Sequence, residues 1–435
     1  MDIQDVLPHI RRLADAGEVY GLKYETTAVE LVDGRTKSAT RKQEYGTAVR
    51  LLSKGRMGFS SALGPCDLKT VAEKAAASAQ FGEEVNFQFV KEKPLRKPTV
   101  YSETVERLSL DKMREMGEKV CSLLKEKCPD GVVEVSVRTG VAEHRIVNTA
   151  GADGSEKFSN FSLSAHIEWV RNDEIILVYG YEVSVRVEDF IEKVVADVSR
   201  QLNWCEREAK LQSGPKDVLF DAKSGVSAII VPLMAGLNGE NIARRTSPLL
   251  GKVGQKLFSE KLTVFDDGTV DNRVGSSSFD CEGTPVRKNV LIDEGVLKGY
   301  VFDLRFGAMA GAVSSGNGKR ASVSSLPRPS FNNFIIKPGD IEFEKMLKGI
   351  KDGVYVVMAL GIGQGNIISG AFSNPLGLAF RIENGEVTGK IRKASIAGNV
   401  YDSFKRIEAL SKETEILGAG EVPHILLSGV SVVAG

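Results

Sequence analysis

The chain has 435 residues, of which 42% are hydrophobic, and its 57 lysines and arginines balance 57 aspartates and glutamates. A chain of this length can bury a large core, and we expect it to form two domains. The formal net charge of zero provides no global field that would attract nucleic acid or an anionic membrane, so a DNA-binding role is disfavoured.

Apolar residues at helical spacing predict an amphipathic helix at the N-terminus, which opens with acidic residues and shows no signal-peptide pattern. Two stretches that partly alternate polar and apolar residues follow, and Lys54-Gly55, within the second of them, lies where a hairpin turn would. Helical periodicity returns after Asp67 and after Ser109, which are candidate N-caps. The Pro-rich and charge-rich segment 91–103 between these helices is predicted to be a loop or linker.

Four polar-apolar alternating runs between residues 131 and 185 predict a meander of antiparallel strands, closed by a helix over 187–204. We therefore expect an α+β N-terminal domain over 1–212, an antiparallel sheet with flanking helices. Gly214-Pro215 breaks this pattern before a new apolar strand. Gly-rich and Asn-rich turns between short strands then predict a β-rich C-terminal domain over 213–435, whose sheet can close on itself.

Cysteine usage and apolar runs predict a soluble, cytoplasmic protein. The five cysteines are odd in number and form no C-x-x-C pair, which favours reduced structural thiols over a disulfide framework or a zinc ribbon. The longest apolar runs, which begin at Ser224 and surround Tyr355, fall short of the roughly 20 residues of a membrane span.

No local motif for a familiar catalytic site is evident. The four histidines are His9, His144, His166 and His424, and their spacing excludes a zinc-binding pair on one helix, so ordinary surface or core roles are favoured. The serines of GSSSFD (Ser276, Ser277 and Ser278) do not fit a nucleophile elbow and are interpreted as polar loop residues.

Each of two glycine-rich segments has two interpretations, either as part of a binding site or as an ordinary turn or loop. GIGQGN, with Gly361, Gly363 and Gly365, resembles half of a dinucleotide fingerprint, but no obvious helix follows, so a turn is favoured. The segment 314–320, SSGNGKR, is either a solvated loop or part of a substrate groove. The groove residues would be Ser314, Gly316, Asn317 and Lys319.

The sequence blocks 265–303, 329–340 and 359–400, together with RIVNTAGADG at 145–154, resemble the TldD/PmbA family, once called modulators of DNA gyrase. Catalytic members of that family carry an H-E-x-x-x-H motif whose histidines bind a metal and whose glutamate can activate the metal-bound water. The resemblance implies a peptidase-related protein over nearly the whole chain.

The stretch that matches the motif is AIIVPLMAGLNGENIARR, in which Gly236, Leu237 and Gly239 keep the family's trailing segment. The histidine, glutamate and histidine of the motif would fall at Ile230, Val231 and Ala235, none of which can bind a metal or accept a proton. The resemblance thus implies a PmbA (TldE) type of chain, with no cofactor of its own.

Three functions follow as hypotheses. In the first, this chain is a non-catalytic, substrate-guiding subunit that pairs with a TldD-like catalytic subunit, which would hold the metal, expected to be zinc, and cleave unfolded peptides. In the second, the chain is a self-sufficient peptidase, acting as a homodimer through polar loop residues around Asp266, Asp280 or Asn317. In the third, it is a regulatory protein-binding module of the gyrase-modulator type. Direct contact with nucleic acid or membrane is not expected.

Overall fold

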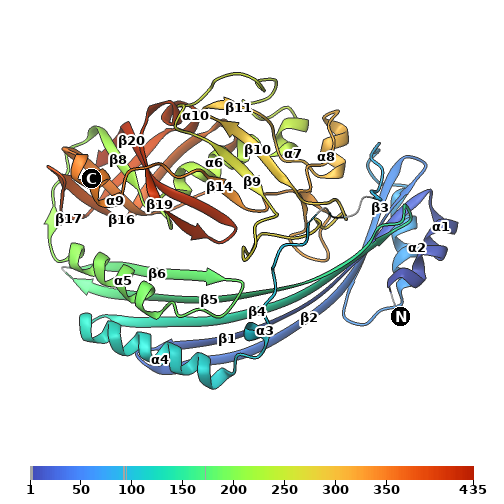
Figure 1. The fold of residues 1–435 in the computed structure, drawn as a ribbon, viewed down its shortest axis with the longest axis horizontal. Coiled ribbons are helices and arrows are strands. Elements are labelled where there is room, and N and C mark those ends of the chain that lie inside the picture. Colours follow the sequence, from blue (N-terminus) through green and yellow to red (C-terminus); the bar gives the residue numbers. More distant parts are fainter. Residues whose placement is uncertain (1–2, 92–93, 95, 172) are drawn as a thin grey trace.

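The computed structural model describes residues 3–91, 94, 96–171 and 173–435 (Figure 1). It is a mixed α+β structure with 23% helix and 43% strand, as predicted. Within these residues, no helix is both long enough and apolar enough to cross a membrane. We refer to the elements up to α5 as the N-terminal half and to those from β7 onward as the C-terminal half.

The N-terminal half is built on an antiparallel sheet of six strands in the order β3-β2-β1-β4-β5-β6. The strands are β1 (Ala16–Val32), β2 (Arg35–Ser53), β3 (Arg56–Leu63), β4 (Val132–Asn148), β5 (Asp153–Arg171) and β6 (Glu174–Ser184). Lys54 and Gly55 join β2 to β3 with φ values of 50° and 75°, the left-handed conformation that a tight hairpin turn of this kind requires. The predicted hairpin and the predicted meander are both confirmed.

Helices cover this sheet at both ends of its long strands (Figure 1). They are η1 (Ile3–Val6), α1 (Leu7–Leu13), α2 (Leu68–Ala79), α3 (Glu103–Glu106), α4 (Leu110–Lys127) and α5 (Ile191–Cys205). The predicted N-caps are confirmed: the Asp67 carboxylate accepts the N–H groups of Lys69 and Thr70, and Ser109 accepts that of Lys112. The predicted loop 91–103 has no helix or strand before Glu103 in its described part; residues 92, 93 and 95 lie outside the described residues.

The C-terminal half contains a larger sheet, part of which closes into a five-stranded barrel of β8, β15, β16, β18 and β20. The predicted closure is therefore confirmed. The strands are β7 (Glu208–Ala209), β8 (Gly214–Phe220), β9 (Val264–Asp267), β10 (Lys288–Asp293), β11 (Val296–Leu297), β12 (Gly318–Lys319), β13 (Arg328–Pro329), β14 (Phe334–Ile336), β15 (Asp352–Ala359), β16 (Ala371–Glu383), β17 (Glu386–Ile391), β18 (Ala394–Asn399), β19 (Ile407–Leu417) and β20 (Gly420–Ala434).

The helices of this half are short. They are α6 (Ser227–Leu237), α7 (Gly239–Ala243), α8 (Leu304–Met309), α9 (Phe343–Gly349) and α10 (Val400–Ser403), with 3-10 turns η2 (Ile367–Ser369) and η3 (Phe404–Arg406). Apolar residues of α6 share one buried cluster with residues of β8, β15, β18 and β20. This cluster is the core of the barrel region, so α6 is held rigidly.

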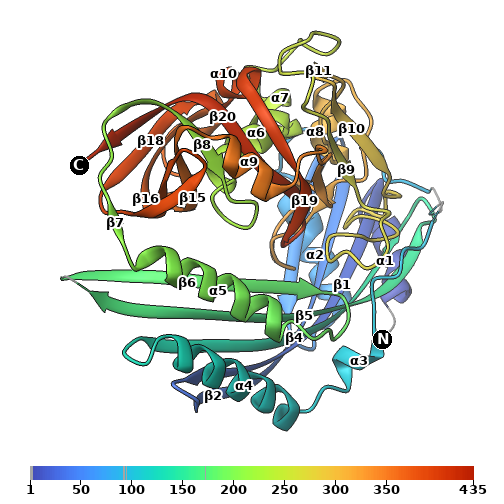
Figure 2. The ribbon, with the colours of Figure 1, turned by 60° about the vertical axis from the view of Figure 1, so that its left-hand side comes forward.

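The two halves pack through α5 and a set of ion pairs, and Figure 2 shows α5 beside the C-terminal half. The Trp204 ring of α5 contacts the rings of Tyr355 and Phe380 at centroid distances of 5.6 and 5.2 Å. Lys223 forms ion pairs with Glu182 and with Asp197. The predicted domain division between residues 212 and 213 stays a prediction.

A Gly58→Ala variant is expected to unfold more easily than the parent. Gly58 of β3 lies under α2, and a Cβ built on it would be 2.1 Å from the carbonyl oxygen of Ala75. The helix must move off the sheet, at a cost of about 1–3 kcal/mol. Thermal and urea unfolding measure the change. Gly349→Ala is the matched control, because nothing lies within 4 Å of its added Cβ; equal stability of both variants would contradict the packing argument.

Candidate functional site

Helix α6 carries the three residues that we matched to the family's metal motif. Ile230 is buried, whereas Val231 and Ala235 are half-buried. Hydrocarbon side chains offer no lone pair to a metal ion, so these positions do not fit the metal of catalytic relatives. In the described part of the chain, no group of three or more His, Cys, Asp or Glu side chains is placed to hold a metal ion. The match of these positions to the motif stays a prediction.

The C-terminal end of α6 is fixed by close contacts. The Tyr401 hydroxyl donates to the carbonyl oxygen of Ile368 at 3.1 Å. A Cβ on Gly236 would lie 2.2 Å from the same hydroxyl oxygen, so only glycine fits there without movement. Just beyond the helix, the Asn238 side chain donates to the carbonyl oxygen of Pro329 at 2.8 Å. This bond ties α6 to strand β13.

The segment GIGQGN forms a turn, as predicted, and the η2 turn that follows it contacts α6. Gly361, Gly363 and Gly365 all have positive φ values, of 67°, 84° and 82°. The three-residue turn η2 and then strand β16 follow, where a dinucleotide site would have a helix.

The segment 314–318 is buried, so the solvated-loop interpretation is wrong. Asn317 has no exposed surface, and its amide donates to Asp266 Oδ2 at 2.7 Å and to the carbonyl oxygen of Ser330 at 2.8 Å. Ser315 donates to the Asn317 side chain, and Gly316 has a φ of 79° against the carbonyl oxygen of Pro285. These contacts fix the backbone that leads into β12. The role of the segment in a substrate groove stays a prediction.

Lys319, the last of the predicted groove residues, is half-buried and lines a cavity of about 580 Å³. The rest of the wall comes from Phe59 of β3, residues 320, 321 and 324–326, Arg328 of β13 and Ser330. Both halves of the chain therefore contribute to the cavity. Because Asn238 bonds to Pro329, the cavity lies close to the end of α6.

The serines Ser276, Ser277 and Ser278, interpreted above as loop residues, are also buried. Ser277 and Ser278 donate to the carboxylate of Glu156 at 3.0 and 2.7 Å. Asn333 donates to Ser276 at 2.8 Å. Ser277 and Ser278 thus connect the C-terminal half to Glu156 of the N-terminal half. Ser276 is connected to the residue that precedes β14.

The acids of the second hypothesis converge on the same segment. Asp266 accepts from Asn317, and Asp280 accepts from the backbone N–H of Gly318 at 2.8 Å. Both carboxyls are almost completely buried, and desolvation raises the pKa of Asp266 to about 6 and that of Asp280 to about 7. Raised pKa values are common at catalytic sites, but burial alone is the largest cause of both rises, and the hydrogen bonds that the two carboxylates accept oppose it.

A charged network that the sequence reasoning missed lies beside these acids. Arg50 pairs with Glu18 at 2.9 Å (Nε to Oε1) and with Glu282 at 2.7 Å (Nη1 to Oε1), and Arg320 pairs with Glu18 at 2.8 Å. All four side chains are essentially unexposed. Glu282 also accepts the N–H of Leu304. The feature of the sequence that could have indicated this network is Arg50, a charged residue inside the apolar run around Val49 and Leu51.

The histidines lie apart from one another. His144 is buried between aromatic rings, stacked on Phe279 at 5.0 Å, and desolvation lowers its pKa to about 3. His424 is buried beside Tyr355, whereas His9 and His166 lie near the surface, where they pair with Glu73 and Glu134. The prediction of ordinary core and surface roles agrees with these positions. All five cysteines are free thiols.

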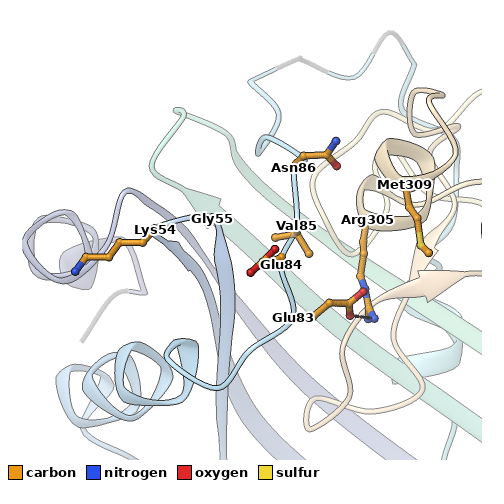
Figure 3. A pocket seen from close by; sticks show the side chains of 8 residues that line it. All are labelled: Lys54, Gly55, Glu83, Glu84, Val85, Asn86, Arg305 and Met309. Atoms are coloured by element: carbon orange, nitrogen blue, oxygen red, sulfur yellow. Dashed lines mark hydrogen bonds and ion pairs between the residues drawn. The ribbon is translucent and has the colours of Figure 1, made fainter.

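A second cavity, of about 460 Å³, lies between the β2–β3 turn, residues 83–86 and α8 (Figure 3). Its charges are mostly used within the chain. Glu83 and Arg305 form an ion pair across it, as the dashed line in Figure 3 shows, while the Lys54 side chain points away. Glu84 pairs with Arg56 at 2.6 Å. This cavity therefore has little unpaired charge for a ligand.

Comparison with known proteins identifies related chains. The family model described as PmbA/TldA metallopeptidase C-terminal domain matches residues 213–434, and that described as PmbA/TldA metallopeptidase domain 1 matches residues 17–79. An uncharacterized protein of Methanocaldococcus jannaschii is 27% identical, with 99% of each chain covered. The metalloprotease TldD homolog of Haemophilus influenzae is also 27% identical, covering 97% of this chain and 90% of its own.

Solved structures share the fold. TldE from Thermococcus kodakarensis superposes with a TM-score of 0.91 at 24% identity over 100% of both chains. A Thermotoga maritima protein named as a proposed modulator of a DNA gyrase superposes with a TM-score of 0.88 at 22% identity over 99% of both chains. Because the family model covers about half of the sequence and the fold matches from end to end, the chain belongs to the PmbA/TldA metallopeptidase family.

Proposed function

We propose that this chain is the non-catalytic, substrate-guiding subunit of a two-component metallopeptidase that cleaves unfolded peptides. The observation that carries the proposal is the chemistry of α6. In a chain that otherwise keeps the family's sequence blocks and fold, Ile230, Val231 and Ala235 have no atom that can bind a metal or accept a proton. The hydrolytic metal, expected to be zinc, would then be held by a TldD-like partner subunit in the cytoplasm.

Two features support a guiding role. An extended peptide can be held by adding a strand to a sheet edge, which needs backbone groups and few special side chains. The β12–β13 ribbon is a separate two-stranded sheet, and it lies at the wall of the cavity that contains Lys319. The cavity and the end of α6 would therefore direct a bound peptide toward the partner's catalytic site.

The second hypothesis, a self-sufficient homodimeric peptidase, has a specific observation in its favour, the raised pKa values of Asp266 and Asp280. Both carboxyls are at most 1% exposed, however, and each is held by hydrogen bonds from the chain itself. A peptide could reach them only if the segment 314–318 moved. The regulatory hypothesis would require neither a partner protease nor a peptide cavity.

Cleavage of an unfolded polypeptide and metal content by elemental analysis test the proposal, with this chain alone, a TldD-like subunit alone, and the mixture. We expect metal in the partner and efficient cleavage only in the mixture. A partner whose motif glutamate is replaced by glutamine is the control and should abolish cleavage without preventing assembly. Metal-dependent cleavage by this chain alone would contradict the proposal, and metal-free cleavage that Asp280→Asn abolishes would favour the second hypothesis.

A further inference from the structure

We propose that the cavity around Lys319, which we call the cationic cavity, binds carboxylate groups of an acidic peptide segment. This inference rests on the proposed function and specifies the class of peptide. Three cations (Lys319, Arg320 and Arg328) and three serines (Ser324, Ser325 and Ser330) line the cavity, and no aspartate or glutamate does so. The charged side chains of the lining are therefore all positive, although the formal net charge of the chain is zero.

Two of the three cations have donors to spare. Lys319 is half-buried, and among the described residues no hydrogen bond or ion pair engages its ammonium group. Arg328 is largely exposed and pairs with Glu240 through Nη1 only, so far as the described residues are concerned. A half-buried ammonium with no partner is costly, and a bound carboxylate would remove that cost.

Arg320 lines the cavity and holds part of its wall in place. Its guanidinium donates to Glu18 at 2.8 Å and to the carbonyl oxygen of Ser325 at 2.7 Å, which holds the serine loop in place. Its Nε is buried and has no partner in the described part of the chain. Phe59 lies under this guanidinium at 5.8 Å. The cations are thus presented by a fixed frame and not by a loose loop.

Acids of the chain reduce the positive potential of the cavity only in part. Glu18 pairs with Arg320 and Glu240 pairs with Arg328, but neither pairs with Lys319. Asp266 and Asp280 lie behind the segment 314–318 and not in the cavity wall, and Lys319 lowers the pKa of Asp266 against the larger effect of burial. Near neutral pH, Asp280, with a pKa of about 7, carries only part of a charge. The ammonium of Lys319 is therefore incompletely neutralised by the chain.

The size of the cavity favours a peptide over a small ion. About 580 Å³ lies in the range of ligand pockets and is several times what one carboxylate fills. Phe59 and Leu326 add apolar surface at the wall. The neighbouring β12–β13 ribbon can contact a peptide backbone while the cations bind acidic side chains or a C-terminal carboxylate.

Isothermal titration of the full chain with unfolded peptides of equal length tests the inference. One peptide carries Asp and Glu residues, the second carries Asn and Gln at the same positions, and the third carries Lys. We expect the acidic peptide to bind about tenfold or more tightly than the neutral one, and the advantage to shrink at high salt. Lys319→Gln should remove most of this advantage, and Arg328→Gln a smaller part, because its side chain is largely exposed.

Lys54→Gln is the matched control, since Lys54 lines the other cavity and is exposed. Equal affinity for acidic and neutral peptides, or no effect of Lys319→Gln, would overturn the inference while leaving the proposed function standing. Partner-dependent cleavage of a neutral peptide would then continue unchanged. The inference would also be overturned if inorganic phosphate bound in a Lys319-dependent way while the three peptides bound equally. If none of the peptides bound, the inference and the proposed function would both be contradicted.

Discussion

An Arg50→Met variant is expected to lose about 3–5 kcal/mol of unfolding free energy, because it leaves the buried Glu282 carboxylate without its Arg50 partner and leaves Glu18 with Arg320 alone. Arg50 is 1% exposed and pairs with Glu18 and Glu282, which are both at 0%. Its guanidinium also lies over the rings of Phe87 and Phe89, at 4.9 and 5.3 Å. Methionine fills similar volume but offers neither carboxylate a donor.

Urea unfolding at neutral pH measures this loss. Arg41→Met is the matched control on the same strand, because Arg41 is 66% exposed and its ion pair with Glu25 lies at the surface. Exposed pairs contribute roughly 0–1 kcal/mol, so this variant should remain close to the parent. A second substitution, Glu282→Gln, should restore part of the stability of Arg50→Met by removing one unpaired charge. Similar stabilities for Arg50→Met and Arg41→Met would contradict the assignment of a buried network.

The unfolding free energy is expected to fall by about 2 kcal/mol between pH 6.5 and 8.5 through Asp303 alone. Burial, and then the charge of Glu282, raises the pKa of Asp303 from 3.8 to about 8. A carboxyl whose pKa is higher in the folded than in the unfolded protein stabilises the fold below the unfolded value. That contribution is lost as the pH rises through the folded value. Asp280 changes stability in the same direction, with a pKa of about 7.

Asp303→Asn isolates this effect. Asp303 is the N-cap of α8 and accepts the N–H of Phe306 at 2.7 Å, a bond that an asparagine carbonyl can also accept. The variant should resemble the parent near pH 6 and be more stable than it at pH 8.5. Chemical unfolding across this range gives the comparison, with Asp402→Asn as an exposed control that should not change the slope. A parent whose stability rises over the same range would contradict the assigned pKa.

His144 changes the stability in the opposite direction, but only slightly between pH 6.5 and 8.5. Burial lowers its pKa from 6.5 to about 3, so its unfolded form is half-protonated at pH 6.5 while the folded form is neutral. The resulting destabilisation is about 0.4 kcal/mol at pH 6.5 and vanishes by pH 8.5, which is small beside the effect of Asp303. The loss of stability up to about pH 8 therefore comes mainly from the buried carboxyls of Asp280, Glu282 and Asp303, and at higher pH the cysteines, whose pKa values burial also raises, add to it.

Much of the local structure could be predicted from the sequence, because short-range chemistry determines it. The caps Asp67 and Ser109 satisfy N–H groups within three residues of themselves, and Lys54-Gly55 supplies the left-handed turn between two strands. The glycines of GIGQGN form a turn for the same local reason. The residue types alone also determined that Ile230, Val231 and Ala235 of α6 have no atom that can bind a metal ion.

The tertiary structure decided what depends on contacts between distant segments. Polarity and glycine content suggested that the segment 314–318 is solvated, but Asp266 and Ser330 accept its hydrogen bonds and make its burial favourable. Arg50 and Glu282 are 232 residues apart in the chain, and no local pattern predicts that they pair. Lys319 could be singled out from the sequence, but its place in a cationic cavity depends on strands from both halves, because burial and charge pairing are properties of the packed chain.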